Sequence, residues 1–249
     1  SNHTGYGAWK GPMIPAADVA AVIDGVEERG AFPRIDAILS GYQGGDDIAD
    51  VIIDAVARVK AANPSAIYAC DPVMGNAKSG CFVADTIPPL LRDKVVPVAD
   101  IITPNQFELG YLTERDVNDL DSTLAAVDAA REMGPSTVLV TSVERPDAPE
   151  DVMEMIAVDD KGKWIVRTPR LPFKRNGSGD VTAALFTGHY LRGLADNPAD
   201  AAKDALAKTA SSVYDLLRVT YEADSQELTL VEAQDYYANP QLQFTVEAL

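Results

Sequence analysis

The sequence predicts an α/β fold in which helices cover both faces of a mainly parallel central sheet, a three-layer α/β/α sandwich. Two observations lead to this prediction. Short apolar runs typical of buried strands alternate with longer segments in which apolar residues recur at helical spacing. The intervening helices are long enough for right-handed crossovers between parallel strands. Because 47% of the 249 residues are hydrophobic, the whole chain can share one core. Residues 1–249 are therefore predicted to form a single domain.

The first half of the chain shows this alternation clearly. Apolar residues at helical spacing predict a helix after Pro15 that ends at Gly30, and a second helix over 48–59 that ends at Asn63. Apolar runs predict strands at 35–39, 66–70 and 100–103, with a short helix at 87–91.

The second half continues the pattern. A helix over 124–133 is stopped by Gly134, and 137–141 is strongly β-prone. Residues 153–158 and 164–167 flank a turn-forming segment and predict a hairpin. Helices are predicted over 178–191 and 198–217, and the segment 227–237 is expected to contain a short strand and a helix.

Charge and composition exclude several classes of function. The formal net charge of -17 disfavours binding to nucleic acid or to anionic lipid, both of which need clustered Lys and Arg. No apolar run approaches the ~20 residues of a membrane span, and no signal peptide opens the chain, so we expect a cytoplasmic protein without a membrane partner. The two cysteines, Cys70 and Cys81, are expected to be reduced.

The most specific short motif is the segment Gly177-Ser178-Gly179-Asp180, which precedes a predicted helix. Its glycines allow the backbone amides to approach a ligand closely. The unpaired N–H groups and the dipole of the helix N-terminus favour an anion at the same place. Asp180 is then placed to act as a general base toward a hydroxyl that attacks a bound phosphoryl group. The alternative is a plain helix cap in which Ser178 is the N-cap residue.

A second candidate cluster lies where predicted strands end. Asp71 follows one strand directly, and Glu108 opens the helix after Thr103-Pro104-Asn105. In parallel sheets ligands bind at the carboxyl ends of the strands, and carboxylates there suit magnesium, which prefers oxygen ligands. The alternative is structural: a turn-forming Asp-Pro pair and a favourable charge at a helix N-terminus. No GxxxxGK[ST] loop occurs, so the chain is not a P-loop kinase.

These motifs together resemble the pyridoxal kinases of the ribokinase-like superfamily. They occur in the same order as in that family and extend over most of the chain. The matching segments are Ser1-Asn2-His3-Thr4-Gly5-Tyr6-Gly7, Ser40-Gly41-Tyr42, Cys70-Asp71-Pro72-Val73-Met74-Gly75, the segment from Asp100 to Glu108, Met133-Gly134-Pro135 and Gly177-Ser178-Gly179-Asp180.

The resemblance implies a ribokinase-like fold and ATP-dependent phosphorylation of the 5′-hydroxyl of pyridoxal, and often of pyridoxine and pyridoxamine. It implies Mg2+ with ATP as co-substrate, frequent assistance by a monovalent cation such as K+, and a homodimer. Asp180 matches the catalytic base, and Gly177, Ser178 and Gly179 match the anion hole. The other implied contacts are ATP binding by Asp71, Thr103, Glu108 and Thr141, metal binding by Asp71 and Glu108, and vitamin binding by Thr4, Gly5, Tyr42 and Asp180.

The chain departs from the family pattern in two ways. The family's N-terminal strand and serine-bearing loop are absent before Ser1, so we expect that a segment is missing there. Asn76 stands where some members carry a second aspartate near the metal. Two alternatives stay open at this point. One is another kinase of the same superfamily, for hydroxymethylpyrimidine or a sugar, and the other is a non-catalytic vitamin B6-binding protein.

Overall fold

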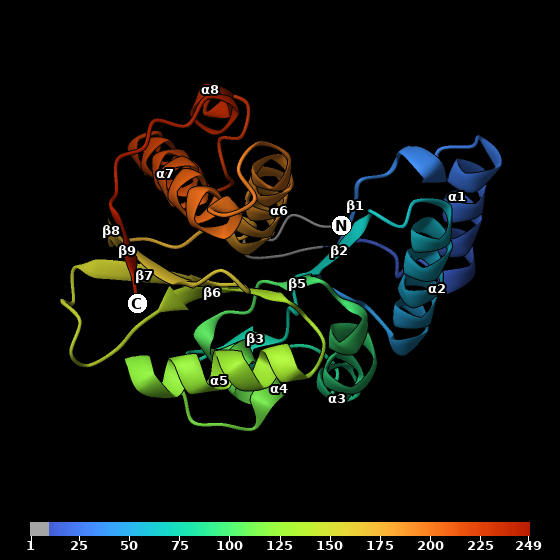
Figure 1. Ribbon diagram of the computed structural model, residues 1–249, viewed down its shortest axis with the longest axis horizontal. Helices are drawn as coiled ribbons and strands as arrows, with labels where there is room; N and C mark the ends of the chain where they lie inside the picture. The colour runs from blue at the N-terminus through green and yellow to red at the C-terminus, as the bar shows by residue number, and fades with distance from the viewer. Residues whose placement is uncertain (1–9) are drawn as a thin grey trace. The chain divides into compact units, whose positions relative to one another are not determined.

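A computed structural model describes residues 10–249 of the chain. Its contacts divide the chain into two compact units. Unit 2 is Pro12–Val138, and the described part of unit 1 is residues 10–11 and 139–249. The predicted class, α/β with a mainly parallel central sheet, is confirmed (Figure 1). The single-domain interpretation stays a prediction.

Unit 2 contains the parallel part of the sheet, with strands in the order β1-β2-β5-β6. In register, Ser40 of β1 lies opposite Cys70 of β2, and Cys70 lies opposite Ile102 of β5. The loops that follow these residues therefore leave from the same edge. The elements of this unit are α1 (Ala16–Glu28), η2 (Phe32–Arg34), β1 (Ala37–Ser40), α2 (Asp46–Ala62), β2 (Ile67–Cys70), β3 (Gly75–Asn76), β4 (Gly80–Cys81), α3 (Ile87–Leu90), η3 (Leu91–Val95), η4 (Val96–Val98), β5 (Ile101–Ile102), α4 (Gln106–Thr113), α5 (Leu120–Glu132) and the start of β6 (Thr137–Val143).

The crossover helices of unit 2 pack against one another in chain order. Helix α2 contacts both α1 and α3, α3 contacts α4, and α4 contacts α5. Helix α2 buries one apolar face, which includes Val56 and Val59. Phe32 and Val59 form a small cluster onto which Ile23 of α1 packs. Crossovers between parallel strands are right-handed. When successive strands are added in one direction across the sheet, right-handed crossovers place their helices side by side on one face of it.

Unit 1 contains the rest of β6 together with β7, β8 and β9, of which β7-β8 and β8-β9 are antiparallel. The predicted hairpin is confirmed: Asp159 Oδ1 accepts hydrogen bonds from the backbone N–H of Lys161 and of Gly162 in its turn. The remaining elements are β7 (Val152–Val158), β8 (Lys163–Pro169), α6 (Ser178–Asp196), α7 (Ala201–Glu222), α8 (Gln234–Ala238) and β9 (Val246–Ala248).

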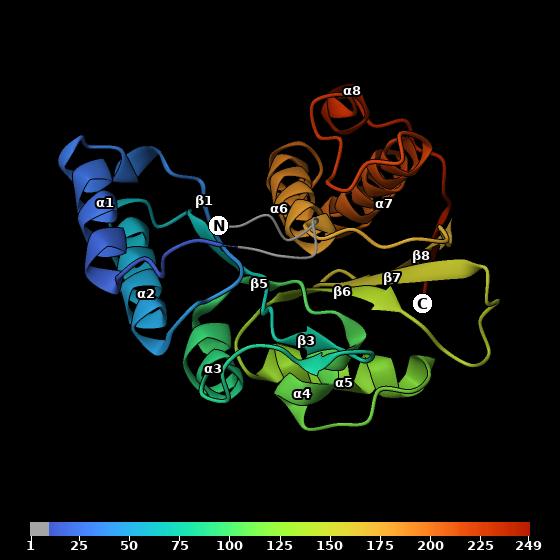
Figure 2. The same ribbon diagram turned by 180° about the vertical axis from the view of Figure 1, so that it is seen from behind.

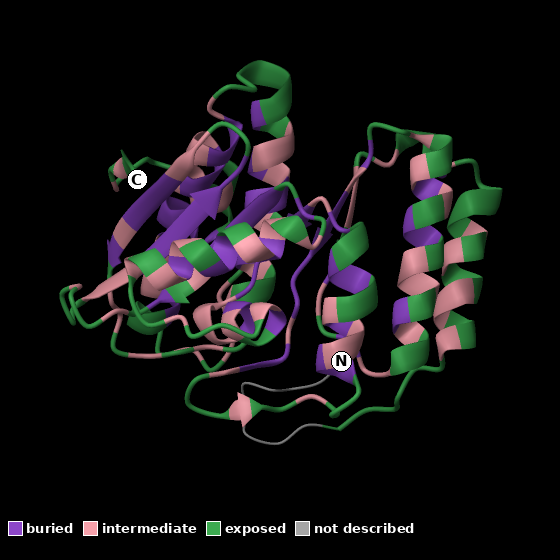
Figure 3. Cartoon of the chain, turned by 60° about the horizontal axis from the view of Figure 1, so that its bottom comes forward, coloured by how far each residue is buried: buried purple, intermediate pink, exposed green. Residues whose placement is uncertain are grey.

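Helices α6 and α7 lie side by side in unit 1 (Figures 1 and 2), and α7 packs on β7 and β8. Their close approach depends on Gly193, where a Cβ atom would lie 3.0 Å from Ala201 Cα. The strands are largely buried whereas the outer helix faces are exposed (Figure 3). The interior of unit 1 is apolar at Ile156, Ile165 and Phe186, each fully buried.

A few local predictions are wrong. The segment 227–237 contains no strand; turns lead into α8, and the last strand is β9 near the end of the chain. Three residues of that segment, Leu228, Leu230 and Val231, are apolar at strand-like spacing, but the turns place them near the end of α7 rather than in the sheet. The short hairpin β3-β4 lies in a segment expected to be loop. Within residues 10–249 no helix is long and apolar enough to span a bilayer.

Candidate active site

In unit 2, the predicted site residues Asp71 and Thr103 lie directly after two neighbouring strands. The Asp71 N–H donates to Ser40 O at 2.8 Å, and the Thr103 N–H donates to Cys70 O at 3.1 Å. The parallel ladder thus continues for one residue and places both at the same edge of the sheet. Both are buried. Thr103 Oγ1 is buried without a hydrogen-bond partner among the described residues, which leaves a donor and acceptor for a ligand.

Glu108 lies at the start of α4 and is only 4% exposed. Its Oε1 accepts from the N–H of Met74 at 2.9 Å and of Gly75 at 3.4 Å, and its Oε2 accepts from the Asn105 N–H at 2.9 Å. Burial raises the pKa of Glu108, while these three N–H groups act in the opposite direction. The carboxylate therefore ties the loop after β2 to the beginning of α4.

Asn105 completes this connection. Its Oδ1 accepts from the Glu108 N–H at 3.0 Å, which closes a capping box, and its Nδ2 donates to Gly75 O at 2.8 Å. Gly75 is required for steric reasons, because a Cβ atom there would lie 2.2 Å from Gly80 O. The structural interpretation of Glu108 as a helix N-terminal charge is thus correct. The spacing of Asn105 and Glu108 already contained the capping signal, which sequence reasoning did not use.

The donors present in unit 2 are compatible with magnesium. Among residues 10–249 no group of three or more His, Cys, Asp or Glu side chains forms a metal cluster. Magnesium in kinases is commonly held by one or two carboxylates together with phosphates and waters, so Asp71 and Glu108 suffice as protein donors. Asn76 serves the local structure instead, because its Oδ1 accepts hydrogen bonds from the Lys78 and Ser79 N–H groups and shapes the β3-β4 turn.

The loop after β1 holds two contrasting neighbours. Tyr42 is 62% exposed, and its assignment to the substrate stays a prediction. Gln43 is fully buried, and neither polar atom of its side chain has a partner among the described residues. Such a buried amide was not foreseen, since nothing in the sequence distinguishes it from an exposed turn residue.

In unit 1, the glycine motif forms the N-terminus of α6. Gly177 is the N-cap residue, with φ 87 and ψ -8, a left-handed conformation that favours glycine. The alternative that Ser178 caps the helix is wrong, because Ser178 is the first helical residue. No side chain in the described part of the chain caps this end. The first N–H groups of the helix therefore stay available to an anion.

Asp180 is in the first turn of the same helix and is exposed, as is Gly179. A carboxylate there can contact a ligand held by the helix N-terminus. Thr141 is half-buried in β6, immediately before Ser142, whose φ of 53 is unusual for a non-glycine residue. Thr4 and Gly5 lie outside the described residues. Unit 1 thus contains the predicted anion hole, the predicted base and Thr141.

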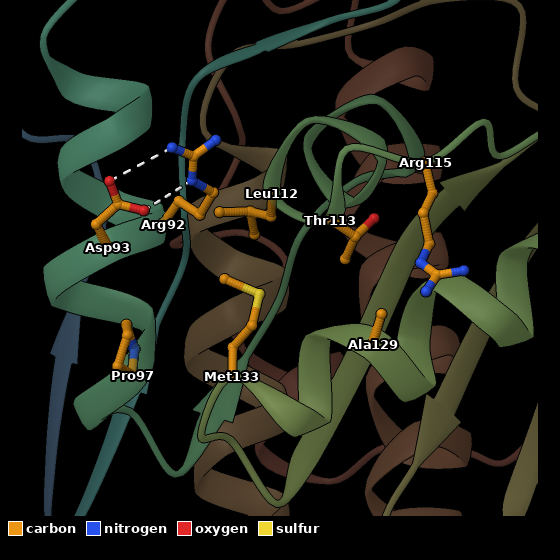
Figure 4. A pocket seen from close by; sticks show the side chains of 8 residues that line it. All are labelled: Arg92, Asp93, Pro97, Leu112, Thr113, Arg115, Ala129 and Met133. Carbon is orange, nitrogen blue, oxygen red and sulfur yellow. Dashed lines mark hydrogen bonds and ion pairs between the residues drawn. The ribbon is translucent and has the colours of Figure 1, made fainter.

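Other reactive side chains are placed for structure. His189 is buried on α6, and burial, with Lys208 and Arg192, lowers its pKa to about 4. Burial raises the pKa of Cys70 to about 12, whereas Cys81 is exposed. A cavity of about 400 Å³ in unit 2 is lined by none of the predicted site residues (Figure 4); its lining includes Arg92, which pairs with Asp93 and Glu114.

Comparison with known proteins identifies the family. The sequence profile of the phosphomethylpyrimidine kinase family matches residues 34–225. The chain is 70% identical over 249 residues to pyridoxal kinase PdxY of Corynebacterium diphtheriae, covering 100% of this chain and 86% of the relative. It is 68% identical over 246 residues to pyridoxal kinase PdxY of Leifsonia xyli, covering 99% of this chain and 85% of the relative. The chain belongs to the pyridoxal kinase family.

Solved structures agree with this assignment. The pyridoxal kinase of Leishmania donovani in complex with ADP and pyridoxamine has a TM-score of 0.87 at 25% identity, covering 100% of this chain and 86% of the other. For the fold alone, a putative phosphomethylpyrimidine kinase of Bacteroides thetaiotaomicron has a TM-score of 0.85 at 22% identity, covering 100% and 84%. The expected ribokinase-like fold and family are confirmed, and the pyridoxal kinases are favoured over the two alternatives left open by the sequence.

Proposed function

We propose that this protein is an ATP-dependent kinase that phosphorylates the 5′-hydroxyl of pyridoxal, and also that of pyridoxine and pyridoxamine. The observation that supports this most strongly is the 70% identity over all 249 residues to a pyridoxal kinase. The Leishmania donovani enzyme has been solved with ADP together with pyridoxamine and together with pyridoxine, which supports the same nucleotide and the same class of vitamin here.

In this proposal Asp180 is the general base. Its exposed carboxylate accepts the proton of the substrate 5′-hydroxyl as the hydroxyl oxygen attacks the γ-phosphorus of ATP. The N–H groups at the start of α6, from Gly177 to Gly179, stabilise the charge on the transferred phosphoryl group. They can do so because no described side chain competes for them. The bond between the γ-phosphorus and the bridging oxygen breaks, and ADP leaves.

Nucleotide binding is assigned to Asp71, Thr103, Glu108 and Thr141. Asp71 and Glu108 would hold Mg2+, which when bound neutralises phosphate charge and helps to align the phosphates. Both Glu108 oxygens also accept backbone hydrogen bonds. The Thr103 hydroxyl has no hydrogen-bond partner among residues 10–249 and can therefore bond the nucleotide.

Thr4, Gly5 and Tyr42 are assigned to the vitamin, with Asp180 at the reacting hydroxyl. We further propose that K+ assists the reaction, that the protein is a homodimer and that it is cytoplasmic. These points rest on the resemblance to the family, and the homodimer can be tested by sedimentation of the purified protein.

The function is tested by incubating the purified protein with Mg2+, ATP and each vitamer, and by separating ADP and the 5′-phosphate product by chromatography. We expect equal amounts of ADP and pyridoxal 5′-phosphate. Hydroxymethylpyrimidine in place of pyridoxal should give a much lower kcat/KM. A preference for hydroxymethylpyrimidine would support the alternative kinase, and pyridoxal binding without ADP formation would support a non-catalytic binding protein.

Magnesium dependence is tested in the same assay. Excess EDTA should abolish turnover, because the charge on the ATP phosphates is then no longer neutralised. Adding back Mg2+ should restore it. Turnover that persists in excess EDTA would contradict the assignment of Asp71 and Glu108 as metal ligands.

A further inference from the structure

The loop between β8 and α6 carries the glycine turn, and its own contacts decide where the amides of that turn point. Glycine adopts many backbone conformations with little cost, so Gly177 and Gly179 do not fix their own orientation. Hydrogen bonds or packing from neighbouring residues must do so. The residues just before the turn, from Phe173 to Asn176, are the nearest candidates.

Arg175 has contacts within this loop and with the turn after α7. Its Nε donates to Ser225 O at 2.6 Å, and its Nη1 donates to Lys174 O at 3.0 Å. Its guanidinium lies over the ring of Phe173, with Cζ 5.0 Å from the ring centroid. The Phe173 ring in turn packs on Tyr221 of α7 at 5.1 Å between centroids. One side chain thus connects the glycine loop to the end of α7.

The turn that receives Arg175 is itself well held. The Ser225 N–H donates to Thr220 O at 3.2 Å, and Ser225 Oγ donates to Glu227 O at 2.6 Å. The Thr229 N–H donates to Thr220 Oγ1 at 3.2 Å. Residues 225–229 are therefore fixed to the last turn of α7, a long helix packed on the sheet of unit 1.

The same turn also approaches the glycine N-cap. A Cβ atom at Gly177 would lie 3.4 Å from Leu228 Cδ1. Contacts from the turn after α7 therefore reach the glycine loop at two points, Gly177 and Arg175. Of these two, Arg175 combines hydrogen bonds with ring stacking.

We propose that Arg175 is a positioning residue for phosphoryl transfer. By bonding Ser225 O and stacking on Phe173, it holds the glycine loop so that the amides of residues 177–179 face the transferred phosphoryl group. This inference rests on the proposed function. Arg175 acts through the loop and not through its charge, because its Nε and Nη1 donors are directed to backbone carbonyls within unit 1.

The substitutions Arg175→Gln and Arg175→Lys test this proposal. Misplacing reacting groups by about 1 Å can cost about 100-fold in rate, so we expect kcat to fall about 10- to 100-fold in both variants. The KM for ATP should change little. Lysine keeps the positive charge but lacks the planar fork that stacks on Phe173 while bonding Ser225 O. A direct electrostatic role would instead leave Arg175→Lys close to wild type.

A binding measurement separates positioning from a general loss of structure. ADP with aluminium fluoride and pyridoxal mimics the phosphoryl group in transfer, whereas ADP alone does not. In Arg175→Gln the dissociation constant for the fluoride complex should rise at least 10-fold relative to that for ADP. Equal weakening of both ligands would show that the loop loses structure as a whole, and would overturn the proposal.

Arg218→Gln is the matched control. Arg218 is also an arginine of unit 1 that stacks on a ring, with Cζ 5.6 Å from the Tyr236 centroid, and it pairs with Asp215 and Glu222. These three partners lie on α7 and α8 and not in the glycine loop. Its loss should lower the thermal midpoint without lowering kcat. Wild-type kcat in both Arg175 variants would overturn the positioning role alone, whereas an inactive wild-type protein would contradict the proposed function itself.

Discussion

The two sets of candidate residues differ in how far they are buried. In unit 2, Asp71, Thr103 and Glu108 are buried, and Glu108 accepts hydrogen bonds from three backbone N–H groups. In unit 1, Asp180 is exposed, and no described side chain caps the helix on which it lies. One set is built into the interior of its unit, and the other is left open to a ligand.

The difference separates two ways in which a polar group serves function. A buried carboxylate such as Glu108 must have hydrogen-bond partners for the fold to be stable, so it shapes its surroundings whether or not a ligand is bound. An exposed carboxylate such as Asp180 costs the fold little and can be devoted to chemistry. Substitutions should therefore affect stability as well as nucleotide binding in the first case, and turnover alone in the second.

The largest effect is expected for Asp180→Asn. Loss of a general base typically lowers kcat by about 10²- to 10⁴-fold, while the free energy of unfolding should hardly change because the side chain is exposed. Steady-state kinetics and urea unfolding measure the two quantities. Asp196→Asn, an exposed aspartate at the other end of α6, is the control and should have wild-type turnover. Near-wild-type turnover in Asp180→Asn would refute the role of Asp180.

A smaller effect is expected for Glu108→Gln, which should mainly lower the free energy of unfolding. In the wild type, each of the two Glu108 oxygens accepts a hydrogen bond from a backbone N–H. A glutamine side chain has only one oxygen, so its NH2 group would face one of these N–H groups and could not accept its hydrogen bond. Leaving a buried donor unsatisfied costs about 1–3 kcal/mol, which urea unfolding can detect. The KM for ATP should rise because the loop from Met74 to Gly75 is released. Glu132→Gln, an exposed residue at the end of α5, should leave both quantities unchanged.

If Glu108→Gln instead lowered kcat as strongly as Asp180→Asn and left stability intact, the contrast between the two units would be wrong. Glu108 would then act mainly through the bound Mg2+ and only weakly through the loop it holds.

The smallest effect is expected for His189→Gln, which lies on the same helix as Asp180 but is buried. Its folded-state pKa of about 4 is below the usual 6.5. Between these values mainly the unfolded chain binds the proton, so the free energy of unfolding falls as pH falls through this range. The variant should lose part of this pH dependence. Its decrease in Tm from pH 7 to pH 5 should therefore be smaller than that of the wild type by a few degrees, since about 1 kcal/mol corresponds to about 2–4 °C for a chain of this size.

Turnover of His189→Gln at pH 7 should equal that of the wild type. Thermal unfolding at several pH values, compared between the two proteins, gives the answer. An unchanged pH dependence would show that His189 is not the group that titrates, and a loss of turnover would show that its burial serves the active site.

Much of the fold was predictable because the signals are local. The helical spacing after Pro15 predicted α1, the run from Thr137 predicted β6, and the turn at Asp159 predicted the β7-β8 hairpin. Of the strand and helix expected in the segment 227–237, the helix is present as α8 and only the strand was mispredicted: Leu228 and Leu230 alternate like strand residues, but Leu228 lies near Gly177. A short segment with alternating apolar residues forms a strand only when the edge of a neighbouring strand is open to pair with it.

The sequence alone determined most of the order of strands and helices, the family resemblance and the residue types that chemistry needs, because periodicity and motif spacing are properties of the chain itself. Only the tertiary structure decided that Glu108 accepts hydrogen bonds from three backbone amides, that Gln43 is buried without partners among the described residues and that Arg175 reaches Ser225. Each of these depends on segments distant in sequence meeting in space, and a hydrogen bond forms only where folding brings its two atoms within about 3 Å.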